Sequence, residues 1–269
     1  MEPQVEKCGA HNLLADEQQA YLEHGYFVRS EAFTPEEVTE LNAACDAVLK
    51  QAKLRSESAN AQTYLLDKKR FTDVDGYTVQ FEFNGTDDIR VIEPVCDLHS
   101  SLEQLVDDPR LCHPMAALLN TERLSLWTAK LNTKGPGSSA FGWHQDTPYW
   151  VHDHPQPDQL PNVMVTLDPQ DSARGGFSVI PRSHVQGCLP GTDDGTQLGG
   201  FYTEPSAVDA TQQETMQVAA GSLIFFHPSI IHGSAANQTQ LPRRALILTY
   251  QAGTRPLLKK PWLTRSVSL

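Results

Sequence analysis

Two potential metal ligands, His144 and Asp146, lie two residues apart in the segment from Phe141 to Trp150. On an extended backbone, side chains at positions i and i+2 leave the same face, so both could bind one ion from a single strand end. An imidazole combined with a carboxylate suits Fe(II) or Mn(II) better than a metal that prefers thiolates. The same spacing also arises by chance, and the alternative is a simple hydrogen bond between the two side chains at the surface.

A third ligand must come from elsewhere in the chain, and His232 is the strongest candidate. It follows an apolar run at 223–226 and precedes Gly233, so we expect it at a strand end from which it can reach a pocket. His227 competes for this role, but Pro228 breaks the strand directly after it. His232 could alternatively be a buried structural histidine. Two histidines and one carboxylate on one face of an octahedron would leave three sites open, as in non-haem Fe(II) oxygenases.

A pair of arginines, Arg243 and Arg244, begins a strand-like run 11 residues after His232. Adjacent strand residues point to opposite faces, so at most one of the two enters the protein interior. A buried arginine is rare unless it meets an anion, and its planar guanidinium fits a carboxylate with two hydrogen bonds. The alternative is that both arginines are surface cations.

Polar and aromatic side chains flank the proposed ligands and could line a substrate site. These residues are Trp143, Gln145, Tyr149 and Trp150. Ordinary packing is the alternative for the aromatic ones. A second histidine pair at 152–154 lies among prolines, so we expect it in an exposed loop without a metal.

The elements that would position these residues are β-strands, because from Leu124 onward the apolar residues alternate with a period of two. The strand-like runs are 124–132, 163–167, 177–180, 223–226 and 245–250. Most of the breaker residues, 17 glycines and 18 prolines in the whole chain, separate these runs with turns. Helices first and strands afterwards predict a β sandwich or jelly roll with helices packed on one face.

The first 120 residues contain helical patterns. A helix is expected over 14–24, and a second begins after Thr34-Pro35-Glu36-Glu37, a capping box with proline at the first helical position. A third is expected over 102–119, interrupted by two prolines. Residues 51–90 are polar with weak periodicity, and we interpret them as a long excursion or a partly ordered lid.

Composition excludes several classes of protein. The chain of 269 residues has a formal net charge of −12, which argues against binding to nucleic acid or to anionic lipid surfaces. No apolar run is long enough to cross a membrane, and the start of the chain does not resemble a secretory signal. The five cysteines are scattered and form no CxxC pair, which indicates a reduced, cytoplasmic protein.

Taken in order, these segments resemble the phytanoyl-CoA dioxygenase-like family of Fe(II)/2-oxoglutarate oxygenases. The resemblance covers about 14–250. It rests on Gly25-Tyr-Phe-Val, Thr34-Pro-Glu-Glu, Lys134-Gly-Pro-Gly, Trp143-His-Gln-Asp146, Gly175-Gly-Phe-Ser-Val-Ile-Pro-Arg-Ser-His184 and His232-Gly-Ser with Arg243-Arg-Ala. It implies one domain over 1–269, with a helical part at about 10–120. It also implies a double-stranded β-helix core, that is, a cupin-like jelly roll, at about 121–255.

The resemblance also implies roles for individual residues. His144, Asp146 and His232 fall on the iron-binding positions. Arg243 falls on the arginine that binds the distal carboxylate of 2-oxoglutarate, and Ser234 falls on the hydroxyl that assists it. Two further positions would line the cosubstrate pocket, Lys130 and Met164, although an aromatic residue is common where Met164 stands. His184 would be a structural hydrogen-bond donor.

The implied reaction uses Fe(II), 2-oxoglutarate and O₂ to hydroxylate an unactivated C–H bond, and it releases succinate and CO₂. Related halogenases lack the carboxylate ligand, so the presence of Asp146 favours hydroxylation. A coenzyme A thioester would need a cationic rim for its phosphates, and only 68–70 and 259–260 offer clustered cations. We therefore expect a small-molecule substrate that is not carried on coenzyme A.

Two readings from other classes stay open. The same fold could be a catalytically silent cupin-like module that binds a metal or senses a small molecule. The retention of all three ligands together with Arg243 argues against that reading. A zinc hydrolase could use the same three ligands, but it would leave Arg243 without a role and would lack an evident general base.

Overall fold

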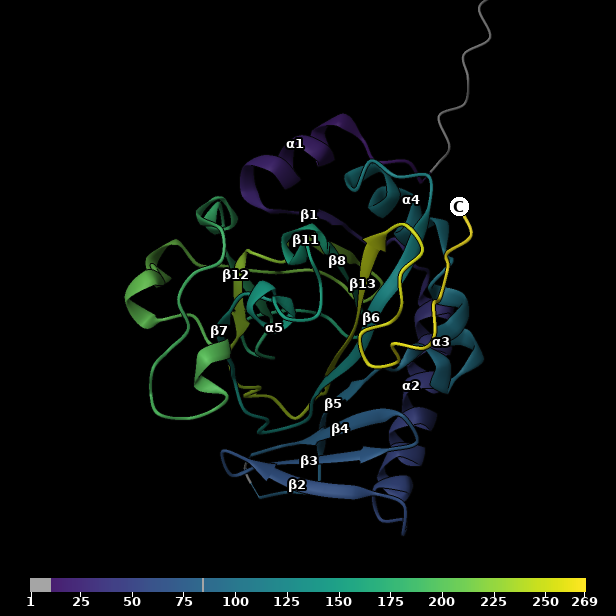
Figure 1. Ribbon diagram of the computed structural model, residues 1–269, viewed down its shortest axis with the longest axis vertical. Helices are drawn as coiled ribbons and strands as arrows, with labels where there is room; N and C mark the ends of the chain where they lie inside the picture. Colours follow the sequence, from purple (N-terminus) through teal and green to yellow (C-terminus); the bar gives the residue numbers. More distant parts are fainter. Residues whose placement is uncertain (1–10, 84) are drawn as a thin grey trace, which may run out of the picture.

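The computed structural model describes residues 11–83 and 85–269, and its core is a pair of antiparallel sheets (Figure 1). One buried cluster joins them, because Phe177 and Val179 of the smaller sheet pack with Met164, Ile224 and other residues of the larger one. The inner faces of the two sheets therefore face each other, as expected of a jelly roll.

The larger sheet has nine strands among the described residues. In spatial order they are β1 (Tyr26–Arg29), β11 (Leu223–Phe226), β8 (Asn162–Thr166), β13 (Arg243–Ala252), β6 (Leu124–Lys134), β5 (Ile89–Glu93), β4 (Tyr77–Phe81), β3 (Lys69–Val74) and β2 (Gln62–Leu66). The smaller sheet contains β10 (Glu214–Thr215), β9 (Phe177–Ile180), β12 (Ile231–Ser234) and β7 (Phe141–His144). The five strand-like runs expected after Leu124 are all confirmed as strands.

Helices cover the outer face of the larger sheet. They are α1 (Ala15–His24), α2 (Pro35–Ser56), α3 (Ser100–Leu105) and α4 (Pro109–Leu118), with the short α5 (Thr147–Trp150) beside β7. The capping box before α2 is confirmed, since the backbone N–H of Glu37 donates to Thr34 Oγ1 over 3.3 Å and Glu37 Oε2 accepts from the Thr34 N–H. Pro109 separates the expected helix at 102–119 into two, because it occupies the first turn of α4.

The expectation for residues 51–90 is wrong, and the part expected to be helical at about 10–120 also contains strands. Helix α2 continues to Ser56, and 62–93 contain a four-stranded meander, β2 to β5, that extends the larger sheet beyond β6 (Figure 1). One face of this meander is apolar and packs in the main core with α2, through Val74, Val79 and Ile92. The other face carries polar residues such as Gln80, so β4 alternates with a period of two, but β2 is largely exposed and β3 contains Lys69 and Arg70, and neither shows that alternation.

Among the described residues, no helix combines the length and the apolar character needed to cross a lipid bilayer. The longest helix, α2, is amphipathic and lies on the sheet with Val38, Leu41 and Val48 buried.

Candidate functional site

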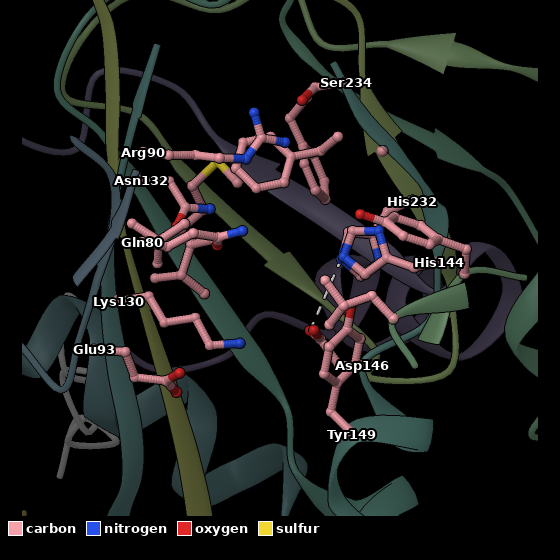
Figure 2. A pocket seen from close by; sticks show the side chains of 18 of the residues that line it. Gln80, Arg90, Glu93, Lys130, Asn132, His144, Asp146, Tyr149, His232 and Ser234 are labelled. Carbon is pink, nitrogen blue, oxygen red and sulfur yellow. Dashed lines mark ion pairs between the residues drawn. The ribbon is translucent and has the colours of Figure 1, made fainter. Parts of the chain in front are cut away.

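A cavity of about 240 Å³ lies between the two sheets, and Figure 2 shows the side chains that line it. The walls come from β3, β4, β5, β6, β8 and β13 of the larger sheet and from β7, β9 and β12 of the smaller one. Every residue that we expected to bind iron or cosubstrate lines this cavity. They are His144, Asp146, His232, Arg243, Ser234, Lys130 and Met164.

The three expected metal ligands converge on one side of the cavity. His144 ends β7 and is the cross-strand partner of His232 on β12, with the two ring centroids 4.1 Å apart. Asp146 Oδ2 lies 3.9 Å from His232 Nε2, and one possible ligand atom from each residue lies within 4.8 Å of the others. One ion could therefore contact all three side chains.

Hydrogen bonds orient both imidazoles for metal binding. His144 Nδ1 lies 2.7 Å from the carbonyl oxygen of Gly142, and His232 Nδ1 lies 2.9 Å from that of Ile230. A carbonyl can only accept, so both Nδ1 atoms carry the proton. Each Nε2 is therefore left with a free lone pair, which is the arrangement found in metal-bound histidines.

Electrostatics keep the two histidines neutral. Burial lowers the pKa of His144 to about 3, and the neighbouring His232 contributes to this shift. Burial likewise lowers the pKa of His232. A neutral imidazole is the form that binds a metal, so the pair is ready to coordinate at neutral pH. Two neutral imidazoles and a carboxylate fit Fe(II).

A chain of buried hydrogen bonds holds the carboxylate ligand. Asn162, the first residue of β8, donates from Nδ2 to Asp146 Oδ2 over 2.9 Å. Asn162 Oδ1 in turn accepts from Thr249 Oγ1 over 2.6 Å, and the backbone N–H of Asp146 donates to the Pro228 carbonyl over 2.8 Å. The sequence did not single out Asn162, because it lies 16 residues from Asp146 and meets it only through the pairing of the strands.

The two adjacent arginines take opposite directions, as the alternation of strand residues predicts. Arg243 is only 3% exposed and lines the cavity, whereas Arg244 pairs outside it with Asp168 over 2.9 Å and Asp46 over 2.6 Å. Arg243 Nη2 lies 3.4 Å from Ser234 Oγ, and Arg243 Nε has no hydrogen-bond partner among the described residues. A buried guanidinium with donors left free is suited to a carboxylate ligand.

Two further basic residues, Lys134 and Arg90, lie near Arg243. Lys134 is its cross-strand partner, is fully buried and lies with Nζ 3.3 Å from the Ser234 carbonyl oxygen. Burial lowers the pKa of Lys134 to about 6, with further contributions from Arg243 and Arg90. Arg90 lines the same cavity and forms a buried ion pair with Glu82 at 3.3 Å. Lys134 is therefore largely neutral at neutral pH and Arg90 is already paired with Glu82, which leaves Arg243 as the cation that favours an anion at this end of the cavity.

Of the four residues that we expected to line the substrate site, one lines the cavity and three do not. Only Tyr149 lines the cavity, with its ring stacked on Phe201 at a centroid distance of 4.4 Å. Trp143 and Gln145 stand next to His144 in an extended segment, so they point away from the face that carries the ligands. Trp150 is buried in a separate cluster with Trp127 and Leu160.

Gln145 has a structural role in this structure. Its Nε2 donates to the carbonyl oxygens of Gly187 and Ser229 over 2.8 and 2.5 Å, and its Oε1 accepts from the Leu189 N–H over 2.8 Å. Gln145 therefore holds the segment at 187–189 next to the site. Our expectation that Gln145, Trp143 and Trp150 line the substrate pocket is wrong for this structure.

The remaining histidines lie outside the cavity. His227 packs against Tyr21 and His184 at centroid distances of 5.8 and 5.1 Å, so it does not compete with His232 for the metal. His184 Nε2 donates to the Leu22 carbonyl over 3.1 Å, a structural contact. His152 and Asp153 are exposed, as expected of the loop at 152–154, whereas His154 is buried against Trp127.

Comparisons with known proteins agree with this geometry. The sequence model of the phytanoyl-CoA dioxygenase family (PhyH) matches residues 21–245. A probable alpha-ketoglutarate-dependent hypophosphite dioxygenase of Stutzerimonas stutzeri is 25% identical over 255 residues, which cover 91% of this chain and 82% of that protein. An ectoine dioxygenase of Bordetella parapertussis is 26% identical over 259 residues, which cover 90% of this chain and 77% of the relative.

A solved structure has the same fold. The crystal structure of EctD from S. alaskensis with 2-oxoglutarate and 5-hydroxyectoine superposes with a TM-score of 0.70 at 22% identity. The match covers 93% of this chain and 79% of that one, so the likeness extends over the overall fold.

Proposed function

The chain belongs to the phytanoyl-CoA dioxygenase family, and from this premise we propose that the cavity hydroxylates an unactivated C–H bond of a small organic substrate. The activity is that of an Fe(II)/2-oxoglutarate-dependent dioxygenase. 2-Oxoglutarate, O₂ and the substrate are consumed, and succinate, CO₂ and the hydroxylated substrate are formed. Bound Fe(II) would supply the sites at which 2-oxoglutarate and O₂ meet.

One observation carries the proposal. His144, Asp146 and His232 converge in the same cavity as the buried Arg243, whose Nε has no partner among the described residues. The three ligands would hold Fe(II), and Arg243 with Ser234 would bind the distal carboxylate of 2-oxoglutarate. Met164 would contribute an apolar wall beside it. A zinc hydrolase would give the buried Arg243 no role.

The charged surface supports a substrate that is not carried on coenzyme A. The cations at 68–70 and 259–260 are largely engaged, since Arg70 pairs with Asp87 over 2.7 Å and Lys260 pairs with Asp97. Lys69 lies over the rings of Phe83 and Tyr202. These cations are poorly placed to bind the phosphates of coenzyme A, which favours a compact substrate inside the cavity.

Succinate formation tests the proposal. We expect the Fe(II)-loaded protein to convert 2-oxoglutarate slowly to succinate in air, and to do so faster when its substrate is added. Replacing Fe(II) by Zn(II) or removing O₂ should stop the reaction. A silent binding module would form no succinate under any of these conditions, and a zinc hydrolase would work with Zn(II) and without O₂.

A further inference from the structure

Two opposite charges stand in the cavity without pairing with each other. Glu93 ends β5 and Lys130 lies on the neighbouring β6, and both line the cavity (Figure 2). Among the described residues they form no ion pair within 4.0 Å, although other buried charges of this protein, such as Arg90 and Glu82, do. Neither charge is neutralised by direct contact between the two groups, so both keep hydrogen-bonding capacity for a ligand.

The ammonium group of Lys130 is free to bind an anion. Within 11–83 and 85–269, its Nζ makes no hydrogen bond, and its ring contacts are with Tyr149 at 5.9 Å and Trp150 at 5.4 Å. Burial alone would lower the pKa of Lys130, but the carboxylates of Glu93 and Asp146 outweigh it and raise that pKa. The side chain is therefore cationic, with three donors to offer.

The carboxylate of Glu93 also has capacity left. Its Oε1 accepts one hydrogen bond, from Thr128 Oγ1 over 2.6 Å, and this is its one side-chain hydrogen bond in the described part of the chain. A carboxylate can accept about four. The bond to Thr128 fixes the orientation of Glu93, while the remaining lone pairs are available to a donor in the cavity.

The position of Lys130 separates it from the expected site of the distal carboxylate of 2-oxoglutarate. Arg243 pairs with Lys134 in the register of β13 and β6, whereas Lys130 pairs with Ile247. Lys134 and Lys130 are four residues apart on β6, which corresponds to about 13 Å along the strand. In Figure 2, Ser234 lies at one end of the cavity, and Lys130 and Glu93 lie at the other, on the side of Asp146.

Two side-chain amides, those of Asn132 and Gln80, lie on the same side of the cavity as Glu93 and Lys130. Val91 of β5 stands opposite Asn132 of β6 and Gln80 of β4, so both amides lie one level along the sheet from Glu93 and Lys130. Asn132 Oδ1 is buried without a hydrogen-bond partner among the described residues. The wall formed by the meander and β6 thus presents Lys130, Glu93 and two amides to the interior of the cavity, in addition to Arg90, which is already paired with Glu82.

We propose that Glu93 and Lys130 select a small zwitterionic substrate, with its cationic nitrogen on Glu93 and its carboxylate or phosphonate on Lys130. This inference rests on the proposed function and adds the class of substrate. A zwitterion compensates both charges at once. A ligand with only one charge would leave the other desolvated and unpaired, which is the usual origin of strong discrimination in polar sites.

Ligand-observed proton NMR tests the inference on the anaerobic Fe(II)·2-oxoglutarate form of the full chain. The probes are small zwitterions, namely α-amino acids, cyclic imino acids and aminophosphonates, each with a derivative lacking the anion and an N-acetyl derivative lacking the cation. We expect at least one zwitterion to bind beside the iron, seen as paramagnetic broadening, and both of its derivatives to bind at least tenfold more weakly.

Two variants assign the charges to residues. Lys130→Met should abolish the discrimination against the derivative without the anion, and Glu93→Gln should abolish the discrimination against the N-acetyl derivative. Lys50→Met, an exposed position on α2, is the matched control and should keep both. Lys130→Met weakening 2-oxoglutarate binding instead would assign Lys130 to the cosubstrate and overturn the inference.

The wild-type protein alone can also refute the idea. Equal binding of a zwitterion and both its derivatives, or binding of no zwitterion in the panel, would overturn it. Succinate formation distinguishes a failure of the proposed substrate class from a failure of the proposed function. A protein that turns over 2-oxoglutarate but shows no preference for zwitterions refutes only the substrate class, whereas a protein that forms no succinate refutes the proposed function.

Discussion

Asn162 holds the carboxylate of Asp146 with a hydrogen bond of 2.9 Å, and both side chains are buried. Asp146 follows the end of β7 in the smaller sheet, whereas Asn162 begins β8 in the larger one. The contact therefore ties the carboxylate ligand on one sheet to the facing sheet. Because Thr249 donates to Asn162 over 2.6 Å, the orientation of the ligand depends on three elements of the fold.

Asn162→Ala should weaken Fe(II) binding about 10- to 100-fold, because partners that orient a ligand typically contribute that much to metal affinity. Thr249→Val, which removes only the second hydrogen bond of the chain, should have a smaller effect in the same direction. Competition with a calibrated chelator under anaerobic conditions measures both affinities. Equal affinity in Asn162→Ala and the unaltered protein would show that the hydrogen bond does not support the metal site.

Asp146→Ala should abolish hydroxylation, since it removes one of the three proposed iron ligands and the carboxylate among them. Asp153→Ala, in the exposed loop that follows α5, is the matched control and should retain wild-type turnover. Succinate release and substrate hydroxylation are measured side by side. If the Asp146→Ala protein turned over at nearly the wild-type rate, Asp146 would not be an iron ligand.

Arg243→Met should raise the KM for 2-oxoglutarate about 10- to 100-fold, because a hydrogen bond to a charged group contributes about 1.5–3 kcal/mol. Arg244→Met is the control, since Arg244 follows it directly in the chain but pairs with Asp168 outside the cavity. Steady-state kinetics with 2-oxoglutarate as the varied reactant distinguish the two. Similar KM values in both variants would argue against a specific role for Arg243.

The stability of the metal-free protein should fall in acid partly through His227. Burial lowers the pKa of His227 to about 4, and His184 adds to the shift, whereas the pKa in the unfolded chain is about 6.5. Between these values the unfolded state binds the extra proton, so this stabilisation is present above about pH 6.5 and is lost as the pH falls to about 4. We expect His227 to account for about 2 kcal/mol of the loss.

Urea denaturation at pH 7 and pH 4.5 measures this contribution. His227→Gln should lose less stability between the two pH values than the wild type does, and the exposed His152→Gln should lose as much as the wild type. Identical losses in the wild type and His227→Gln would mean that another group is responsible.

The sequence was sufficient for the strands that carry the ligands. The period of two after Leu124 predicted β6, β8, β9, β11 and β13. The alternation of strand residues predicted that the side chains of Arg243 and Arg244 would point to opposite faces of the sheet. Local capping also predicted α2 correctly, because Thr34 and Glu37 bond within one turn. These features depend on residues close together in the chain.

Features that depend on distant residues were not predicted. The meander at 62–93 was missed because its first two strands, β2 and β3, show no regular alternation of apolar and polar residues, and their pairing with the rest of the sheet is not visible in the sequence. Asn162 and Glu93 became visible only when strand pairing placed them beside Asp146 and Lys130. The misplacement of Trp150 has the same cause, since an aromatic residue near a ligand packs wherever the core leaves space, here against Trp127.

The central claim is that His144, Asp146, His232 and Arg243 form one site for Fe(II) and 2-oxoglutarate. Its most direct test is an anaerobic titration of the Fe(II) protein with 2-oxoglutarate, followed by visible absorbance. We expect a weak charge-transfer band that saturates at one 2-oxoglutarate per chain and that is lost in His232→Ala. An absent band in the wild-type protein, or an unchanged band in His232→Ala, would contradict it.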